Sequence, residues 1–118
     1  MSKIFVYGTL KKNSWNHGWL EDSTFVREQA VHGFKLFQSG IPYMIRTDNP
    51  EDRVLGEVYE VSEKTRGNID RLEGHPDWYR REIVSMDSDG EIQGYVYHGY
   101  ISGNVQESEK NSNGWYVF

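Results

Sequence analysis

The sequence predicts an α+β domain in which a twisted or barrel-like mixed sheet carries one or two short helices. Five or six short segments have the β-branched and aromatic composition of strands. A further segment has the start and stop signals of a helix. The elements do not follow the repeated strand–helix alternation of a parallel α/β fold. The 118 residues fit one domain, residues 1–118, with a core of its own.

The first expected strand covers residues 3–7, where isoleucine, phenylalanine, valine and tyrosine all favour extended backbone. Gly8 ends this strand. The polar stretch at residues 11–22 is expected to form a loop with a single helical turn. Trp15 and Trp19 lie four residues apart in it and would share one helical face.

Two strands are expected in the middle of the chain. Residues 31–37 alternate between apolar and polar side chains, and the glycine–proline stretch at residues 40–42 breaks that strand. A polar turn follows at residues 47–53. Residues 54–61 have the strongest strand pattern, with Glu57 on the same face as several apolar side chains.

The expected helix begins after Ser62, a favourable N-cap residue. It ends near Leu72 or Glu73, with Leu72 among the side chains that face the core. Gly74 stands where a helix C-terminal glycine belongs, and Pro76 prevents continuation. The glutamate therefore lies at or next to the last residue of the helix.

The second half of the chain predicts an antiparallel hairpin, with strands at residues 79–86 and 91–100. The Asp-Ser-Asp-Gly turn at residues 87–90 joins them. Residues 102–114 are polar and are expected to form a flexible loop. Residues 115–118 are expected to form either a final strand or a docked tail.

Composition excludes several classes of function. The net charge of −5 argues against nonspecific nucleic-acid binding, which needs a basic face. The absence of cysteine excludes a disulfide scaffold, a cysteine nucleophile and a thiolate metal site. No signal peptide pattern or apolar run of about 20 residues is present. We therefore expect a cytoplasmic protein without membrane partners.

The turn after the first strand is the first candidate site. It reads Tyr7-Gly8-Thr9-Leu10. A glycine at a strand end lets the backbone bend and lets a ligand approach closely, and successive N–H groups in such a turn can bind an anion such as a carboxylate. The alternative is an ordinary turn glycine. The glycine spacing matches neither a phosphate loop nor a dinucleotide-binding motif.

Glu73 is the second candidate, as a general base. At a helix C-terminus its carboxylate meets the negative end of the helix dipole, and Asp70 on the same face would raise its pKa further. The alternative is a solvated residue at a helix end. Glu57 is the competing acid, for which we favour a structural ion pair with an arginine such as Arg80 or Arg81.

No metal site is expected. The four histidines, His17, His32, His75 and His98, have no metal-ligand spacing. His75 lies close to Glu73 in the sequence and would either orient it or serve as a loop residue. The nucleophile-elbow pattern of a serine hydrolase is also absent.

Four segments together resemble the gamma-glutamyl cyclotransferase superfamily, which includes gamma-glutamylamine cyclotransferases and AIG2-like and BtrG-like proteins. Phe-Val-Tyr-Gly-Thr-Leu at residues 5–10 is similar to the signature turn of these proteins. Residues 56–61 resemble their central strand, residues 69–74 with Tyr79 and Arg80 resemble their catalytic segment, and residues 94–97 resemble a later strand. The similarity spans nearly the whole chain in the right order, although residues 102–113 match no family pattern.

The resemblance implies a compact mixed β-barrel of about five to seven strands with a few short flanking helices. It implies that Glu73 is the catalytic acid/base and that the glutamyl group is bound by Tyr7, Gly8, Thr9, Leu10 and Tyr79. The implied reaction needs no metal or cofactor. It cyclises a small gamma-glutamyl amine to 5-oxoproline and releases a free amine. Two alternatives are a BtrG-like deacylase that acts on a larger amine and a non-catalytic binding or regulatory module.

Overall fold

A computed structural model describes residues 2–86, 90–97 and 106–118, which form two sheets and two short helices. The larger sheet contains β1 Ser2–Val6, β2 Thr24–His32, β5 Arg53–Val61, β6 Tyr79–Met86 and β7 Gly90–Tyr97. The smaller sheet contains β3 Phe34–Ser39, β4 Ile41–Arg46 and β8 Gln106–Glu107. The helices are the 3-10 helix η1 His17–Leu20 and the α-helix α1 Glu63–Glu73. Neither helix has the length and apolar character that crossing a membrane requires.

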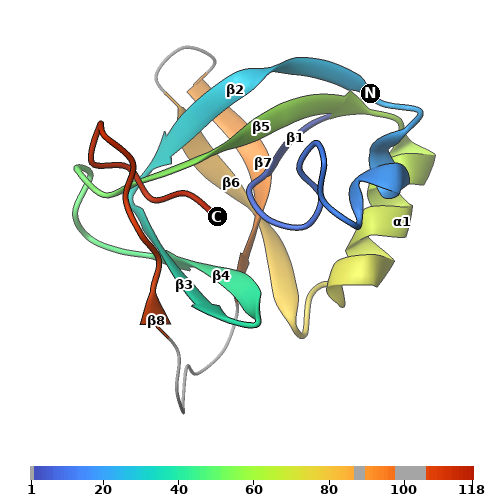
Figure 1. Cartoon of the computed structure of the whole chain (residues 1–118). Helices are drawn as coiled ribbons and strands as arrows, with labels where there is room; N and C mark the ends of the chain where they lie inside the picture. The colour runs from blue at the N-terminus through green and yellow to red at the C-terminus, as the bar shows by residue number, and fades with distance from the viewer. Residues whose placement is uncertain (1, 87–89, 98–105) are drawn as a thin grey trace.

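The larger sheet closes into a barrel with the strand order β1-β5-β2-β6-β7 (Figure 1). Neighbouring strands run antiparallel except for β1 and β7, which pair in parallel through Ile4 with Gln93 and Phe5 with Gly94. Closure leaves the barrel without an open edge. The α+β class and the mixed β-barrel are confirmed, and the smaller sheet brings the described strands to eight.

The second half of β1, Ile4-Phe5-Val6, is buried on both faces, which explains its unbroken apolar sequence. Phe5 and the following Tyr7 belong to a core cluster shared by barrel strands and the smaller sheet. Ile4 and Val6 belong to a second cluster, which includes Ile69 of α1. Side chains alternate between the two faces of a strand, so β1 anchors both clusters. The turn that follows β1 therefore starts from a rigid position.

Most expected strands are confirmed, but the single strand expected over residues 31–37 is wrong. Gly33 has a φ of +81°, a left-handed conformation that suits glycine, and it separates β2 from β3. Gly40, with a φ of +80°, turns β3 into β4, which we did not expect. β6 and β7 pair as the predicted antiparallel hairpin. Residues 87–89 of its turn and residues 98–100 of the expected return strand lie outside the described residues.

The helix is confirmed together with both of its ends. The Ser62 hydroxyl accepts a hydrogen bond from the Thr65 N–H at 3.1 Å, which satisfies a free donor of the first turn. Gly74 takes the left-handed conformation, with a φ of +69°, and ends the helix directly after Glu73. Leu72 differs from its prediction, because 36% of its surface is exposed.

The end of the chain is more structured than its polar sequence predicts. Residues 102–105 of the expected flexible loop lie outside the described residues, but β8 pairs with β3 through Gln106 and Glu107. Tyr116 is buried, donates its N–H to the Arg53 carbonyl and accepts from the Leu55 N–H, both at 2.8 Å. Residues 115–118 thus form a docked tail beside β5.

Candidate functional site

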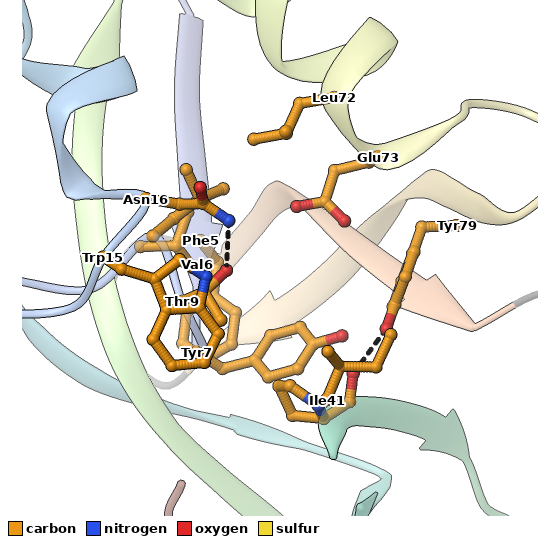
Figure 2. Close-up of a pocket in the computed structure, with 13 residues that line it drawn as sticks. Phe5, Val6, Tyr7, Thr9, Trp15, Asn16, Ile41, Leu72, Glu73 and Tyr79 are labelled. Carbon is orange, nitrogen blue, oxygen red and sulfur yellow. Dashed lines mark hydrogen bonds between the residues drawn. The ribbon is translucent and has the colours of Figure 1, made fainter. Parts of the chain in front are cut away.

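A pocket of about 170 Å³ lies where the turn after β1 meets the end of α1 and the start of β4 (Figure 2). This volume suits a group about the size of one amino acid, since pockets for drug-sized ligands start at about 300 Å³. The pocket is lined by Phe5, Val6, Tyr7, Gly8, Thr9, Leu10, Trp15, Asn16, Ile41, Pro42, Leu72, Glu73 and Tyr79. All six residues predicted for the site are among them.

The turn from Tyr7 to Leu10 is fixed by hydrogen bonds to the loop that follows it. The Lys11 N–H donates to the Gly8 carbonyl at 3.0 Å, and the Asn16 N–H donates to the Thr9 carbonyl at 3.0 Å. The Asn16 side-chain amide also donates to the Thr9 hydroxyl at 2.9 Å (Figure 2). The turn is therefore held in shape before any ligand binds.

Gly8 is required by a close contact of the backbone. A Cβ atom at this position would lie 2.5 Å from the Pro42 Cγ atom, well inside van der Waals contact. We expected a glycine that permits bending and the approach of a ligand. The contact shows that Gly8 also lets the turn pack directly against the start of β4.

The backbone N–H groups of Gly8, Thr9 and Leu10 donate no hydrogen bond to any residue that the structure describes. Gly8 and Leu10 are buried, and unpaired buried N–H groups are rare in proteins. All three residues line the pocket. Such a set of adjacent donors is suited to an anion or a polarised carbonyl oxygen.

Glu73 extends from the last residue of α1 into the same pocket (Figure 2). Burial raises the pKa of its carboxyl from 4.5 to about 7, because desolvation disfavours the charged form. The carboxylate makes no hydrogen bond or ion pair with the described residues. It can therefore exchange a proton near neutral pH with a ligand in the pocket.

The predicted cause of this pKa shift needs correction. We expected the helix dipole and Asp70 to raise the pKa, whereas desolvation is the dominant cause. Arg81 binds both carboxylate oxygens of Asp70, at 3.0 and 3.2 Å, and neutralises its charge. His75 does not orient Glu73, because its Nδ1 atom accepts the Arg81 N–H at 3.0 Å and fixes the turn into β6.

Two tyrosine hydroxyls differ in their availability to a ligand. The Tyr7 hydroxyl accepts the Met44 N–H at 3.3 Å and donates to no described residue. Burial, with the nearby Tyr79 and Glu73, raises the Tyr7 pKa, so this hydroxyl keeps its proton. The Tyr79 hydroxyl donates to the Pro42 carbonyl at 2.7 Å (Figure 2). Tyr7 is therefore a candidate donor, and Tyr79 forms part of the pocket wall.

Comparison with known proteins identifies the family. The family described as "Gamma-glutamyl cyclotransferase, AIG2-like" matches residues 4–117. The chain belongs to the gamma-glutamyl cyclotransferase, AIG2-like family. The turn at residues 7–10 and Glu73 both lie inside the matched region of this family member.

Individual relatives agree with the family assignment. A protein of Methanocaldococcus jannaschii, provisionally named a gamma-glutamylcyclotransferase, is 43% identical over 82% of this chain and 83% of its own length. The gamma-glutamylaminecyclotransferase of Rattus norvegicus is 38% identical over 73% of this chain and 64% of its own length. The crystal structure of an AIG2-like protein of Mus musculus has a TM-score of 0.69 at 30% identity, and covers 84% of this chain and 77% of the mouse chain.

Glu57 has a structural role in this family member, but its partners differ from those expected. One of its oxygens accepts the Lys12 N–H at 2.8 Å and the Tyr59 hydroxyl at 2.9 Å. The arginines suggested as partners bind elsewhere, Arg80 to Glu82 and Arg81 to Asp70. Glu57 thus ties β5 to the loop that follows the turn.

Seven pocket residues were not predicted for the site: Phe5, Val6, Trp15, Asn16, Ile41, Pro42 and Leu72. Trp15 was expected to share a helical face with Trp19, but η1 begins at His17 and contains only Trp19. Pro42 was predicted only to help end the strand expected over residues 31–37. Asn16 lies on the polar loop, and its side-chain amide, which can form hydrogen bonds, was the one feature of the sequence that could have indicated a role at the site. In the part of the chain that the structure describes, no cluster of three or more His, Cys, Asp or Glu could hold a metal ion.

Proposed function

We propose that this chain is an enzyme that cyclises the gamma-glutamyl group of a small gamma-glutamyl amine, releasing 5-oxoproline and a free amine. One observation supports it above the others. The half-buried Glu73 carboxylate has no hydrogen-bond or ion-pair partner among the described residues. It shares a pocket with the three free N–H groups of the turn at residues 7–10. A cyclotransferase needs both a proton acceptor and an oxygen-binding turn.

In the proposed reaction the substrate carries its own nucleophile. Its α-ammonium group gives a proton to the Glu73 carboxylate, and the resulting amine attacks the γ-carbonyl carbon to form a five-membered ring. The protonated Glu73 then gives that proton to the leaving nitrogen as the carbon–nitrogen bond breaks. A second proton passes from the ring nitrogen to the released amine, which departs as an ammonium ion.

Positioning would supply much of the rate. Intramolecular attack is strongly favoured once the reacting atoms are held close together. The N–H groups of Gly8, Thr9 and Leu10 would bind oxygens of the glutamyl group, including the oxygen that becomes negative during attack. The protonated Tyr7 hydroxyl would add a further donor beside Glu73. Tyr79 would contact the substrate through its ring.

The names of relatives support an amine as the leaving group. The rat relative is named as a gamma-glutamylaminecyclotransferase. The reaction as proposed uses side chains and backbone groups of the chain alone, with a small molecule as the partner. The cytoplasmic location expected from the sequence stays a prediction.

The decisive test is release of 5-oxoproline by the purified protein from a panel of gamma-glutamyl amines. We expect product from at least one small member. Product only from larger gamma-glutamylated amines would favour a BtrG-like deacylase. Binding of gamma-glutamyl ligands without product from any member would favour a non-catalytic binding module.

A second test concerns the turn itself. Gly8→Val places a side chain against Pro42, where even a Cβ atom would lie 2.5 Å from the ring. We expect the turn to shift and the affinity for a gamma-glutamyl ligand to fall. A thermal unfolding curve separates this effect from general unfolding. Unchanged affinity in the folded variant would show that the turn does not bind the glutamyl group.

A further inference from the structure

The side-chain hydroxyl of Thr9 has its oxygen bound and its hydrogen free. A threonine hydroxyl accepts hydrogen bonds through its oxygen and donates one through its hydrogen. The Asn16 side-chain amide donates to the oxygen at 2.9 Å. The hydroxyl donates its own hydrogen to no residue that the structure describes. That hydrogen is therefore available to a ligand.

The Thr9 hydroxyl belongs to the wall of the pocket. Thr9 and Asn16 both line the pocket, and both are partly buried. Figure 2 shows the hydrogen bond between them on the opposite side of the pocket from Glu73. The hydrogen of a hydroxyl rotates to suit its surroundings, and it turns away from a group that donates to the same oxygen. The Asn16 amide therefore restricts the directions in which Thr9 can donate.

Asn16 is held beside Thr9 by contacts that do not involve its side chain. The Asn16 backbone N–H donates to the Thr9 carbonyl at 3.0 Å. The Nδ1 atom of the following residue, His17, donates to the Leu10 carbonyl at 3.0 Å, since a carbonyl oxygen can only accept. The side chain of Asn16 can therefore be changed without releasing the loop from the turn.

We propose that Asn16 is a positioning residue, which makes the Thr9 hydroxyl a donor to an oxygen of the bound glutamyl group. This proposal rests on the proposed function, because it adds a side-chain donor to the free N–H groups of the turn. No described residue that lines the pocket is a lysine, arginine or histidine. Negative charge on a ligand oxygen would thus be stabilised here by neutral donors, and the direction of each donor decides how well it does so.

Substitution of Thr9 tests the donor. Thr9→Val keeps the shape of the side chain and removes the hydroxyl, whereas Thr9→Ser keeps the hydroxyl. We expect Thr9→Val to weaken the binding of 5-oxoproline, measured by isothermal titration calorimetry, by about tenfold or more, and Thr9→Ser to stay within about threefold. KM for a gamma-glutamyl amine should rise with little change in kcat, because the contact is present in both ground and transition states. Normal binding by Thr9→Val would overturn the proposal.

A double-mutant cycle separates positioning from general support of the turn. Asn16→Ala removes the amide but keeps the backbone N–H that binds the Thr9 carbonyl. Alone, it leaves the hydroxyl free to rotate and should weaken 5-oxoproline binding about fivefold. Combined with Thr9→Val, it should weaken binding by less than about twofold further, because the hydroxyl on which it acts is gone. Equal effects in both backgrounds would make Asn16 a structural residue and overturn its positioning role.

Reversal of the hydrogen bond provides the sharpest comparison. Asn16→Asp supplies carboxylate oxygens, which accept the Thr9 hydroxyl hydrogen and turn it away from the ligand. We expect 5-oxoproline binding to fall at least as far as in Thr9→Val. The same change made in the Thr9→Val background measures the effect of the added charge alone and should be smaller. Equal losses in the two backgrounds would contradict the proposal.

Asn13→Gly is the matched control for loss of an amide from this loop. Asn13 is exposed, does not line the pocket and has a φ of +69°, which glycine also adopts. We expect unchanged 5-oxoproline binding, and a loss equal to that of Asn16→Ala would overturn the specific role of Asn16. Thermal unfolding curves identify any variant that fails to fold.

The two levels of the argument fail separately. If the unmodified protein releases 5-oxoproline but the cycle shows no coupling between Thr9 and Asn16, the positioning role is overturned and the proposed function stands. Absence of 5-oxoproline from every gamma-glutamyl amine would instead overturn the proposed function, and this inference with it.

Discussion

Two half-buried glutamates flank the loop after β1, and they differ in their hydrogen-bond partners. Glu57 accepts hydrogen bonds from the Lys12 N–H and the Tyr59 hydroxyl. Glu73 has no partner among the described residues, and burial raises its pKa to about 7. A charged carboxylate that receives donors is stabilised in place, whereas one without donors is left to exchange its proton.

The difference shows how the fold separates stability from chemistry. Glu57 lies in the middle of β5, where strand pairing fixes its backbone on both sides. Glu73 lies at the end of α1, immediately before the left-handed Gly74, where its side chain can reach the pocket. From the sequence alone, both glutamates were candidates for the catalytic acid. Their hydrogen-bond partners distinguish them.

The largest expected effect contrasts Glu73→Gln with Glu57→Gln. If Glu73 carries the proton, its replacement should lower kcat for 5-oxoproline release by about a thousandfold, within the range for a general acid/base. Glu57→Gln should change kcat by less than about tenfold, because the amide keeps an oxygen acceptor. Binding of a gamma-glutamyl ligand by both variants serves as the control. Full turnover by Glu73→Gln would remove this residue from the mechanism.

The pH profile is the next effect in size. Glu73 must be ionised to accept a proton, so kcat/KM should fall about tenfold per pH unit below its pKa of about 7. A carboxyl with an ordinary pKa of 4.5 would keep the profile flat down to about pH 5. Initial rates from pH 5 to pH 8 distinguish these cases. Glu57→Gln should show the same profile as the unmodified protein.

Raising the pH should lower the stability of the unmodified protein, whereas it should raise its activity. The Glu73 pKa is raised on folding, so its favourable contribution is present below pH 4.5 and is lost as the pH rises through about 7. Glu73→Gln should therefore match the unmodified protein at pH 4 and exceed its unfolding free energy at pH 8 by about 2 kcal/mol, after allowance for solvent screening. Urea denaturation at the two pH values measures this. Equal stability at pH 8 would contradict the raised pKa.

The smallest effect concerns the structural acid. Glu57→Ala removes the acceptor for the Lys12 N–H and the Tyr59 hydroxyl, so the unfolding free energy should fall by about 1 kcal/mol. Urea denaturation at pH 7 measures the loss, and Glu57→Gln should recover part of it. A variant as stable as the unmodified protein would mean that these hydrogen bonds contribute nothing net.

Local signals predicted the fold where they were strong. Ser62 and Gly74 mark the ends of α1 because capping depends on residues next to each other in the chain. The strands around Gly33 and Gly40 were misread, since a left-handed glycine can turn a strand into a new one as well as end it. β8 was missed because its pairing with β3 depends on a distant partner.

The candidate site was predictable only in part, for a similar reason. Glu73 was identified from its place at the helix end, but its pKa shift comes from burial among residues distant in sequence. Asp70 was misjudged because its arginine partner lies beyond the helix, on β6. Ile41 lines the pocket only because β4 is folded against the turn after β1. Tertiary contacts of this kind leave no pattern in the local sequence from which they could be predicted.

The parallel contact between β1 and β7 also has a consequence for how the chain folds. β1 precedes β7, its second neighbour in the barrel, by most of the described chain and is therefore made well before it. The Lys11 ammonium group similarly donates a hydrogen bond to the carbonyl of Phe118, 107 positions downstream. Contacts of such long range slow folding, and the unpaired side of β1 is open to other strands until β7 arrives. Closure of the barrel is therefore expected to be a late step of folding, and chaperones that shield strand edges would raise the yield of folded protein.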